Sequence, residues 1–305
     1  MENDNHLWGI DLGGTKIEGA VINGTDAGKV LFRYRLPTGA EKGYHHVINQ
    51  IANVVRTMEE HLGYRPGVIG IGTPGTLDPQ TRTLKNSNST VLNGKPLKDD
   101  LQDALRMEVR MANDANCFAL AETLMGVVKE KFPAARVVFG VIMGTGVGGG
   151  IVVDGKVING LQGIAGEWGH NYLDESGGAC YCGKSGCVEK ILSGPALEKF
   201  YCSLSGTQKS LSDICRLARE ENDRHARATL ERLTRFFGLA LSVVINILDP
   251  DVVVIGGGVS NVDELFTGGV ESLRKYVFNN RLETPVVKPV LGDSAGVFGA
   301  ALLSK

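Results

Sequence analysis

The sequence predicts a two-lobed α/β protein whose core is built twice. Two glycine-rich segments, residues 11–16 (DLGGTK) and 144–150 (GTGVGGG), lie about 130 residues apart. Each follows one apolar run and leads into another, a pattern that predicts a tight turn between two strands. The length of 305 residues favours about two domains, which agrees with one such turn in each half.

The first half should form a mixed sheet with helices packed on it. Three strands joined by hairpins are expected over residues 7–36, and later strands alternate with helices. The elements expected after these strands are a helix at 44–62, a strand at 68–72, a turn-rich segment at 77–97, a helix at 97–105, a strand at 109–112 and a helix from 113 to about 128.

The second half should repeat the strand meander from residue 137 and then carry a cysteine-rich loop over 160–190. The elements expected after it are helices at 194–204, 210–220 and 223–247, a strand at 251–255, a helix at 261–276, a strand at 286–290 and a terminal helix within 292–301. We expect one lobe of residues 1–120 joined by 291–305, and a second of residues 121–290. A nucleotide and a small substrate would meet in the cleft between them.

Composition excludes several classes of function. The net charge of −2 and the pI near 6.3 do not favour binding to nucleic acid or to acidic membranes. No apolar stretch reaches the 18 residues of a membrane span. The polar, acidic start of the chain is unlike a secretion signal, so a cytoplasmic protein is expected.

The two glycine turns are suited to holding phosphate groups. Glycine lets backbone N–H groups approach an anion, and Thr15 and Thr145 add hydroxyl donors. Residues 144–149 formally satisfy G-x-G-x-x-G, but the following segment 151–158 is an apolar run broken by Asp-Gly, which predicts a hairpin instead of the helix that a dinucleotide fold needs. No P-loop motif is present. The alternative is that both are ordinary hairpin turns.

A metal site is predicted in the cysteine-rich loop. His170, Cys180, Cys182 and Cys187 offer one imidazole and three thiolates within 18 residues, the donor set of a closed structural zinc site. Iron–sulfur ligation would normally show four cysteines. The alternative is three free cysteines. The zinc should act as a staple of residues 166–190. The other cysteines are expected to be buried thiols: Cys117, Cys202 and Cys215.

Two aspartates could take part in chemistry. Asp114 lies where a strand ends and a helix begins, and its alternative role is to cap that helix. Asp11 ends the first strand beside a glycine turn, where it is either a turn residue or a holder of water or Mg²⁺. Together with two phosphate-binding turns, these carboxylates predict phosphoryl transfer from ATP, with one of them deprotonating the attacking hydroxyl group.

These motifs resemble the ROK (repressor, ORF, kinase) sugar kinases of the actin-like ATPase superfamily, whose fold is a duplicated ribonuclease H-like one. The resemblance covers nearly the whole chain and is most specific from the second glycine turn through His170 to the cysteine loop. The matching segments are 11–16, 72–75, 113–116, 144–150, 166–170, 180–187, 256–258 and 292–299.

The resemblance implies an ATP-dependent hexokinase that phosphorylates a 6-hydroxyl group, with Asp114 as general base. His170 would bind the sugar with one ring nitrogen and zinc with the other. The terminal helix would pack on the first lobe, and a homodimer is expected. The implied sugar contacts are Gly75, Asn88, Asn113, Asp114, Glu167, His170 and Glu189. The implied contacts to ATP and Mg²⁺ are Asp11, Gly13, Gly14, Thr15, Lys16, Gly144, Thr145, Gly146, Gly256, Gly257 and Gly258.

The resemblance also bears on the sugar. Residues 85–94 and 165–171, which include Trp168, look more like the fructokinase and mannokinase branch than the N-acetylglucosamine kinase branch, although the short interval from His170 to Cys180 is closer to the glucokinases. Fructose is therefore the expected substrate, with mannose or glucose next. The alternatives are an N-acetylhexosamine kinase and a non-catalytic sugar-sensing regulator. The first strand is expected by about residue 7, which leaves no room for an N-terminal helix-turn-helix and favours the enzyme.

Overall fold

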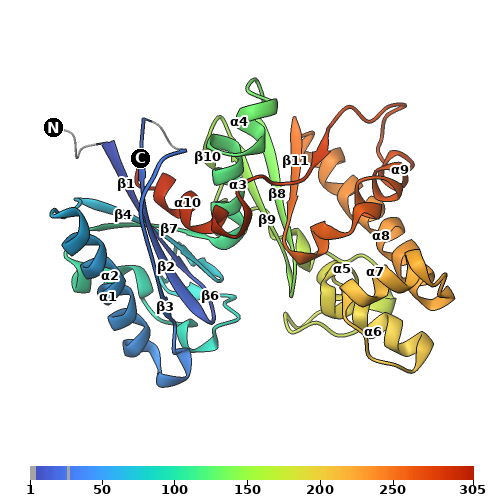
Figure 1. The fold of residues 1–305 in the computed structure, drawn as a ribbon, viewed down its shortest axis with the longest axis horizontal. Helices are drawn as coiled ribbons and strands as arrows, with labels where there is room; N and C mark the ends of the chain where they lie inside the picture. The colour runs from blue at the N-terminus through green and yellow to red at the C-terminus, as the bar shows by residue number, and fades with distance from the viewer. Residues whose placement is uncertain (1–4, 26–27) are drawn as a thin grey trace. The chain divides into compact units, whose positions relative to one another are not determined.

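A computed structural model describes residues 5–25 and 28–305 (Figure 1). Residues 1–4, which carry most of the acidic start of the chain, lie outside the described part. The chain divides into two compact units: the first is Met1–Pro133, Gly150–Ala165 and Val290–Lys305, and the second is Ala134–Gly149 and Gly166–Pro289. The predicted lobe boundaries, and the cleft between the lobes, stay predictions.

The first sheet is mixed, as the hairpin signals predict. It contains β1 (His6–Leu12), β2 (Lys16–Asn23), β3 (Val30–Pro37), β4 (Val68–Thr73) and β7 (Glu108–Asn113) in the order β3-β2-β1-β4-β7. The β1–β2 and β2–β3 pairs are antiparallel, whereas the β1–β4 and β4–β7 pairs are parallel. The carboxyl ends of β1, β4 and β7 therefore lie at one edge of the sheet, because parallel strands run in the same direction.

Helices cover both faces of this sheet (Figure 1). The predicted bounds of α1 (Tyr44–Leu62) and α2 (Leu97–Leu105) are confirmed. A methyl group on Gly19 of β2 would meet α1, whereas one on Gly9 of β1 would lie 2.3 Å from the backbone of Ala301. Since side chains alternate between faces along a strand, α10 (Ala295–Leu302) covers the face opposite to α1.

The second sheet repeats the order of the first. Its strands are β8 (Val137–Met143), β9 (Val147–Val153), β10 (Lys156–Val157), β11 (Val252–Gly256) and β12 (Val286–Val287), in the order β10-β9-β8-β11-β12. If the five strands of each sheet are numbered in the order in which they occur along the chain, the spatial order in both sheets is third, second, first, fourth and fifth. The fold class predicted from the twin glycine turns, a duplicated α/β core, is confirmed.

The remaining elements are mostly helices. The long helix α8 packs against α6, α7 and α9. The bounds are β5 (Thr76–Leu77), β6 (Leu84–Lys85), α3 (Asp114–Leu124), α4 (Val127–Lys131), α5 (Glu189–Leu192), α6 (Gly194–Ser205), α7 (Leu211–Glu220), α8 (Arg224–Leu248) and α9 (Gly268–Arg274). No helix in residues 5–25 and 28–305 combines the length and the apolar character that crossing a membrane requires.

Three predicted elements are shorter than expected. The helix expected to run to residue 128 ends at Leu124, and α4 follows after Gly126. Gly126 is needed there because a methyl group on it would lie 2.1 Å from a carboxylate oxygen of Glu122, which accepts the N–H of Val127 at 3.0 Å. The helix expected at 261–276 is divided into a 3-10 turn at Asp263–Leu265 and the α-helix α9. The strand β12 is confined to two residues between Pro285 and Pro289.

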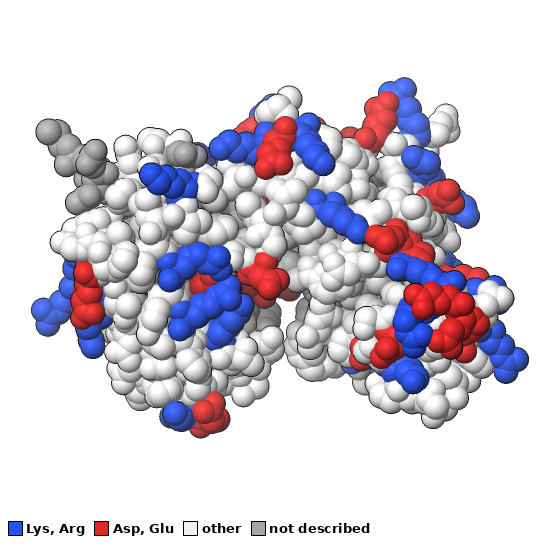
Figure 2. Space-filling model, viewed as in Figure 1, with Lys and Arg blue, Asp and Glu red and all other residues white. Residues whose placement is uncertain are grey.

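Charged side chains of both signs are mixed on the face shown in Figure 2. Several form ion pairs within one unit, such as Arg219 with Glu264 at 2.5 Å and Lys288 with Asp263 at 2.7 Å. Exposed pairs of this kind contribute little to stability. They agree with the small net charge of the whole sequence.

Candidate active site and metal centre

Asp11 lies near the carboxyl end of β1, on the face of the first sheet that α10 covers. It pairs with Gly72 of β4 in parallel register, and a methyl group on Gly72 would lie 3.6 Å from Asp11 Oδ1. A methyl group on Gly296 of α10 would lie 3.0 Å from Asp11 Oδ2. The two glycines therefore make room for this carboxylate beside the first turn of α10, where the helix dipole favours negative charge.

The turn after Asp11 is held by backbone contacts. The Gly13 N–H donates to Lys16 O at 2.9 Å, and the buried Thr38 donates its hydroxyl to Gly13 O at 2.7 Å. The Thr38 N–H donates to Thr15 O at 3.0 Å. Gly14 and Thr15 are exposed at the tip. The turn is thus fixed from below while its outer surface stays open, which suits the predicted contact with phosphate groups.

Asp114 opens α3 directly after the last residue of β7. The side chain of Asn113 caps this helix, because its Oδ1 accepts the Asn116 N–H at 2.8 Å. Asp114 Oδ1 accepts the adjacent Ala115 N–H at 2.8 Å. The capping role that was the alternative for Asp114 is therefore filled by Asn113, and the Asp114 side chain is exposed.

The pKa values of Asp11 and Asp114 are both raised, and the charge of Asp114 contributes to the shift of Asp11. Desolvation, followed by the negative charges of Asp114 and Glu18, raises the pKa of Asp11 to about 6. Although Asp114 is exposed, the protein atoms crowded around its carboxyl group raise its pKa by desolvation, and the Ala115 N–H opposes this shift. Burial and both carboxylates raise the pKa of the Cys117 thiol. A carboxylate with a raised pKa is a stronger base, which suits it to accept a proton from a hydroxyl group.

Two further predicted sugar contacts lie in the segment between β4 and α2. Gly75 has φ of +85°, and a methyl group there would lie 2.5 Å from Lys85 O and 2.7 Å from Ser87 N. Only glycine fits this turn without strain. Asn88 is exposed after the short strands β5 and β6. The structure brings Asp11, Asn113 and Asp114 to one edge of the first sheet, and no recorded contact joins Asn88 to them.

The second glycine turn is fixed within the second unit. The Gly144 N–H donates to Gly146 O at 2.9 Å, and the Gly194 N–H, at the start of α6, donates to Gly144 O at 2.9 Å. Thr145 is exposed at the tip of the turn. Its hydroxyl is therefore open to a ligand, as the phosphate-binding prediction requires.

The glycines that end β11 lie against this turn. Gly256 is the last residue of β11, and Gly257 has φ of +82°. A methyl group on Gly257 would lie 2.4 Å from Met143 O, and the Cβ position of Gly144 is 3.9 Å from Gly258 N. The predicted nucleotide contacts of the second unit are therefore neighbours, although they are more than 100 positions apart in the sequence.

Two of the predicted sugar contacts, Glu189 and Glu167, lie close to the start of β9, which follows the second glycine turn. Glu189, the first residue of α5, accepts the Val147 N–H on its Oε2 at 3.0 Å. Glu167 precedes a helical turn in which its carbonyl oxygen accepts the His170 N–H at 3.3 Å. Trp168 donates its indole N–H to Gly148 O at 3.1 Å.

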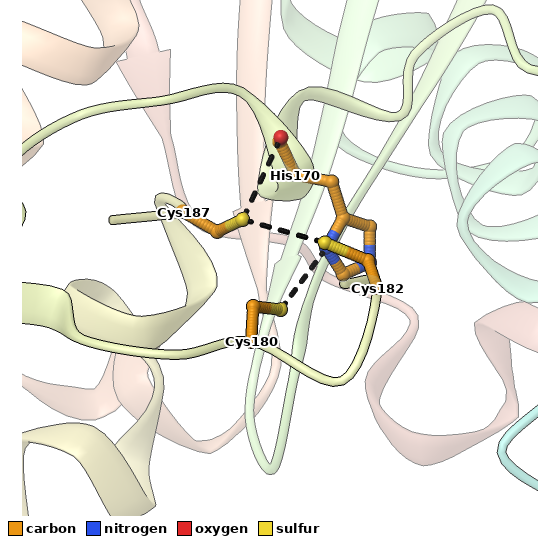
Figure 3. Close-up of side chains that lie close together, drawn as sticks. All are labelled: His170, Cys180, Cys182 and Cys187. Carbon is orange, nitrogen blue, oxygen red and sulfur yellow. Dashed lines mark hydrogen bonds between the residues drawn. The ribbon is translucent and has the colours of Figure 1, made fainter. Parts of the chain in front are cut away.

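His170 and the three cysteines of the loop converge on one point (Figure 3). Their candidate ligand atoms all lie within 4.8 Å of one another. The Cys180 Sγ to His170 Nδ1 distance and the Cys182 Sγ to Cys187 Sγ distance are both 3.6 Å. A tetrahedral zinc ion with Zn–S bonds of about 2.3 Å separates its sulfur ligands by roughly 3.8 Å. The residues therefore fit a structural zinc ion, with His170 turning Nδ1 toward it.

The other ring nitrogen of His170 contacts a residue that the sequence analysis did not single out. Tyr181 lies between Cys180 and Cys182, and its hydroxyl is 3.0 Å from His170 Nε2. The two rings meet edge to face with centroids 5.2 Å apart. The sequence offered one indication of this contact: Tyr181 lies between two predicted metal ligands, Cys180 and Cys182, so its backbone must lie close to theirs.

The sequence matches the ROK family over residues 7–305. The chain belongs to the ROK family. An N-acetyl-D-glucosamine kinase of Haemophilus influenzae (strain 86-028NP) is 35% identical to this ROK protein over 97% of this chain and 98% of its own length. Among solved structures, a ROK hexokinase from Thermus thermophilus is 32% identical, with a TM-score of 0.86 over 98% of this chain and 97% of that one. A ROK family glucokinase from Streptomyces griseus, in complex with glucose and AMPPNP, is 28% identical, with a TM-score of 0.78 over 98% of this chain and 99% of that one.

The prediction of fructose as substrate is wrong, because curated relatives that are 34–35% identical over 97% of this chain are N-acetyl-D-glucosamine kinases. Trp168, which contributed to that prediction, is 4% exposed and packs edge to face on Phe139 with ring centroids 5.9 Å apart. Trp168 is part of the core of this ROK protein, so its packing accounts for a tryptophan at this position without reference to the sugar. The expected homodimer and cytoplasmic location stay predictions.

Proposed function

We propose that this ROK protein is a kinase that transfers the terminal phosphoryl group of ATP to the 6-hydroxyl group of N-acetyl-D-glucosamine. The observation that carries the proposal is the 35% identity to an N-acetyl-D-glucosamine kinase over 97% of the chain. The two glycine turns, which are open at their tips, and the pair of carboxylates on the first sheet supply groups that such a reaction needs.

In the first unit, Asp114 is the proposed general base. It would accept the proton of the attacking hydroxyl group, and its raised pKa favours that step. Asn113 holds the start of α3 through its capping bond and so fixes the direction of Asp114. Asp11, with Gly13, Gly14, Thr15 and Lys16 beside it, is the proposed holder of Mg²⁺ and the phosphate groups, where the metal would spread the negative charge that develops.

In the second unit, the proposed contacts to ATP are the turn 144–146 and the glycines 256–258. The proposed contacts to sugar hydroxyl groups are Glu167, His170 and Glu189. Zinc, held by His170 and the three cysteines, would fix the loop that carries these side chains. Support comes from the bond of Glu189 to Val147, which ties a proposed sugar contact to the proposed phosphate turn.

The substrate is tested by measuring ADP release with a panel of sugars: N-acetylglucosamine, N-acetylmannosamine, glucose, mannose and fructose. We expect the highest kcat/KM with N-acetylglucosamine and a 6-phosphate product by ³¹P NMR. A higher kcat/KM with glucose would favour the activity named for the Thermus thermophilus relative. Failure to phosphorylate any of them would favour a sugar-sensing regulator and overturn the proposal.

The role of Asp114 is tested by Asp114→Asn. We expect kcat to fall at least ~10²-fold, the lower end of general-base contributions, while calorimetry still shows binding of the sugar. Asp103→Asn is the matched control, since Asp103 is an exposed carboxylate on α2. Normal turnover by Asp114→Asn would refute the assignment of the base.

A further inference from the structure

The hydroxyl group of Tyr181 occupies the nitrogen of His170 that the proposed function assigns to the sugar. His170 Nδ1 faces Cys180 Sγ at 3.6 Å, on the side of the metal ligands, and Nε2 faces Tyr181 Oη at 3.0 Å (Figure 3 shows the His170 ring among the three sulfurs). An imidazole has only two ring nitrogens. With one committed to the metal side, a sugar hydroxyl can reach only the nitrogen that Tyr181 already holds.

A phenol and a sugar hydroxyl are interchangeable in this contact. When Nδ1 binds a metal ion, Nε2 carries the ring proton and is a donor. The oxygen of either hydroxyl group accepts that bond and keeps its own O–H for another acceptor. Tyr181 therefore provides His170 with the same type of bond that a bound sugar would provide.

Little holds Tyr181 in this position. Its side chain is 70% exposed, on a turn between Cys180 and Cys182. Within the described ranges its side chain makes the hydrogen bond and the edge-to-face contact with the His170 ring, and the Glu189 carboxylate lies close enough to act on its hydroxyl through charge. Releasing it would therefore forfeit one exposed hydrogen bond and one ring contact, and no part of the core would be disturbed.

We propose that Tyr181 is a positioning residue that stands in for a sugar hydroxyl; this inference rests on the proposed function of His170. In the empty site the phenol keeps Nε2 hydrogen-bonded and the ring turned toward the metal ligands. An arriving sugar takes over the bond and Tyr181 moves away. The contact reduces the affinity for the sugar, because part of the binding free energy is used to displace the phenol.

Tyr181→Phe tests this inference, since it removes the hydroxyl and keeps the ring. We expect calorimetry on the zinc-loaded protein to show N-acetylglucosamine binding about 2- to 10-fold more tightly than in the wild type, the range that corresponds to one net hydrogen bond. The KM for the sugar should fall by a similar factor, and the KM for ATP should not follow it. Tyr172→Phe is the matched control: Tyr172 is 66% exposed on the same loop, and its hydroxyl has no recorded hydrogen bond among the described residues.

The possible outcomes separate the two proposals. Equal or weaker sugar binding by Tyr181→Phe with zinc retained would overturn the inference, and so would loss of zinc, which would show that the phenol builds the metal site. A wild-type protein that binds none of the sugars would overturn both proposals. If the wild type prefers glucose, the proposed substrate is wrong, and the gain in Tyr181→Phe is then measured with glucose.

Discussion

The raised pKa of Asp11, caused first by desolvation and then by repulsion from Asp114, predicts that Asp11→Asn stabilises the protein at neutral pH. The environment of Asp11 raises its pKa from 3.8 to about 6, first through desolvation and then through the charges of Asp114 and Glu18. Each pKa unit corresponds to about 1.4 kcal/mol, so the ionised carboxylate costs the folded state about 3 kcal/mol above pH 6. Because asparagine keeps the polar group but not the charge, we expect it to recover about 1–3 kcal/mol.

The pH dependence of this gain follows from linkage. Between pH 3.8 and about 6, the folded protein binds the Asp11 proton more tightly than the unfolded chain does. The contribution of Asp11 to stability therefore falls as the pH rises through this window. The difference in stability between Asp11→Asn and the wild type should thus be largest at pH 7–8 and should shrink by more than half at about pH 4.5, where Asp11 is mostly protonated in the folded protein.

Thermal unfolding at several pH values measures this effect. A gain of this size corresponds to an increase in Tm of a few degrees for a protein of this length. Asp78→Asn is the control of opposite sign, because a hydrogen bond from Lys85 and backbone N–H groups lower the pKa of Asp78 to about 2. It should lower Tm at pH 8. A lower Tm for Asp11→Asn at pH 8, or a gain that does not change with pH, would refute the electrostatic argument.

Three other substitutions test the metal loop and the packing of the first unit. Cys182→Ser should lose zinc, measured by mass spectrometry, together with most of the sugar affinity; normal affinity without zinc would refute the role of the staple. Gly70→Ala should lower Tm by an amount corresponding to about 1–3 kcal/mol, because the new methyl group would lie 1.8 Å from Ala300 O. Gly67→Ala is its control and should leave Tm unchanged, because a methyl group there would meet nothing within 4 Å. Glu122→Gln should cost about 1–3 kcal/mol by turning an amide toward backbone N–H groups, and an unchanged Tm would contradict this.

Local patterns in the sequence were enough to predict elements whose formation depends on their own residues. The helix over 44–62 has an apolar set at helical spacing, and those residues are the ones buried in α1. The metal ligands were identified because cysteine and histidine at short spacing have few other uses. The strand–turn–strand pairs β1–β2 and β8–β9 that open the two sheets followed from the repeated glycine pattern, whereas the order of the later strands did not.

Features that depend on distant parts of the chain could not be predicted in this way. The break between α3 and α4 accompanies the buried carboxylate of Glu122, which also accepts the N–H groups of Val290 and Leu291 at 3.2 and 3.0 Å. Those donors are 168 and 169 positions away and carry no signal near residue 122. Trp168 misled the choice of sugar for a similar reason, because its packing against Phe139 cannot be recognised from its neighbours in sequence.

The position of Glu189 predicts how a structural metal ion would influence the proposed reaction without taking part in its chemistry. The residue follows Cys187 by two positions, so zinc at the cysteines would fix the start of α5. Its Oε2 accepts the Val147 N–H, directly after the turn that carries Thr145 and Gly146. With Oε2 engaged there, Oε1 is the oxygen left for a sugar hydroxyl. A shift of the zinc loop would therefore move a proposed sugar contact and disturb a proposed phosphate turn together, and the affinities for both substrates should depend on the same metal.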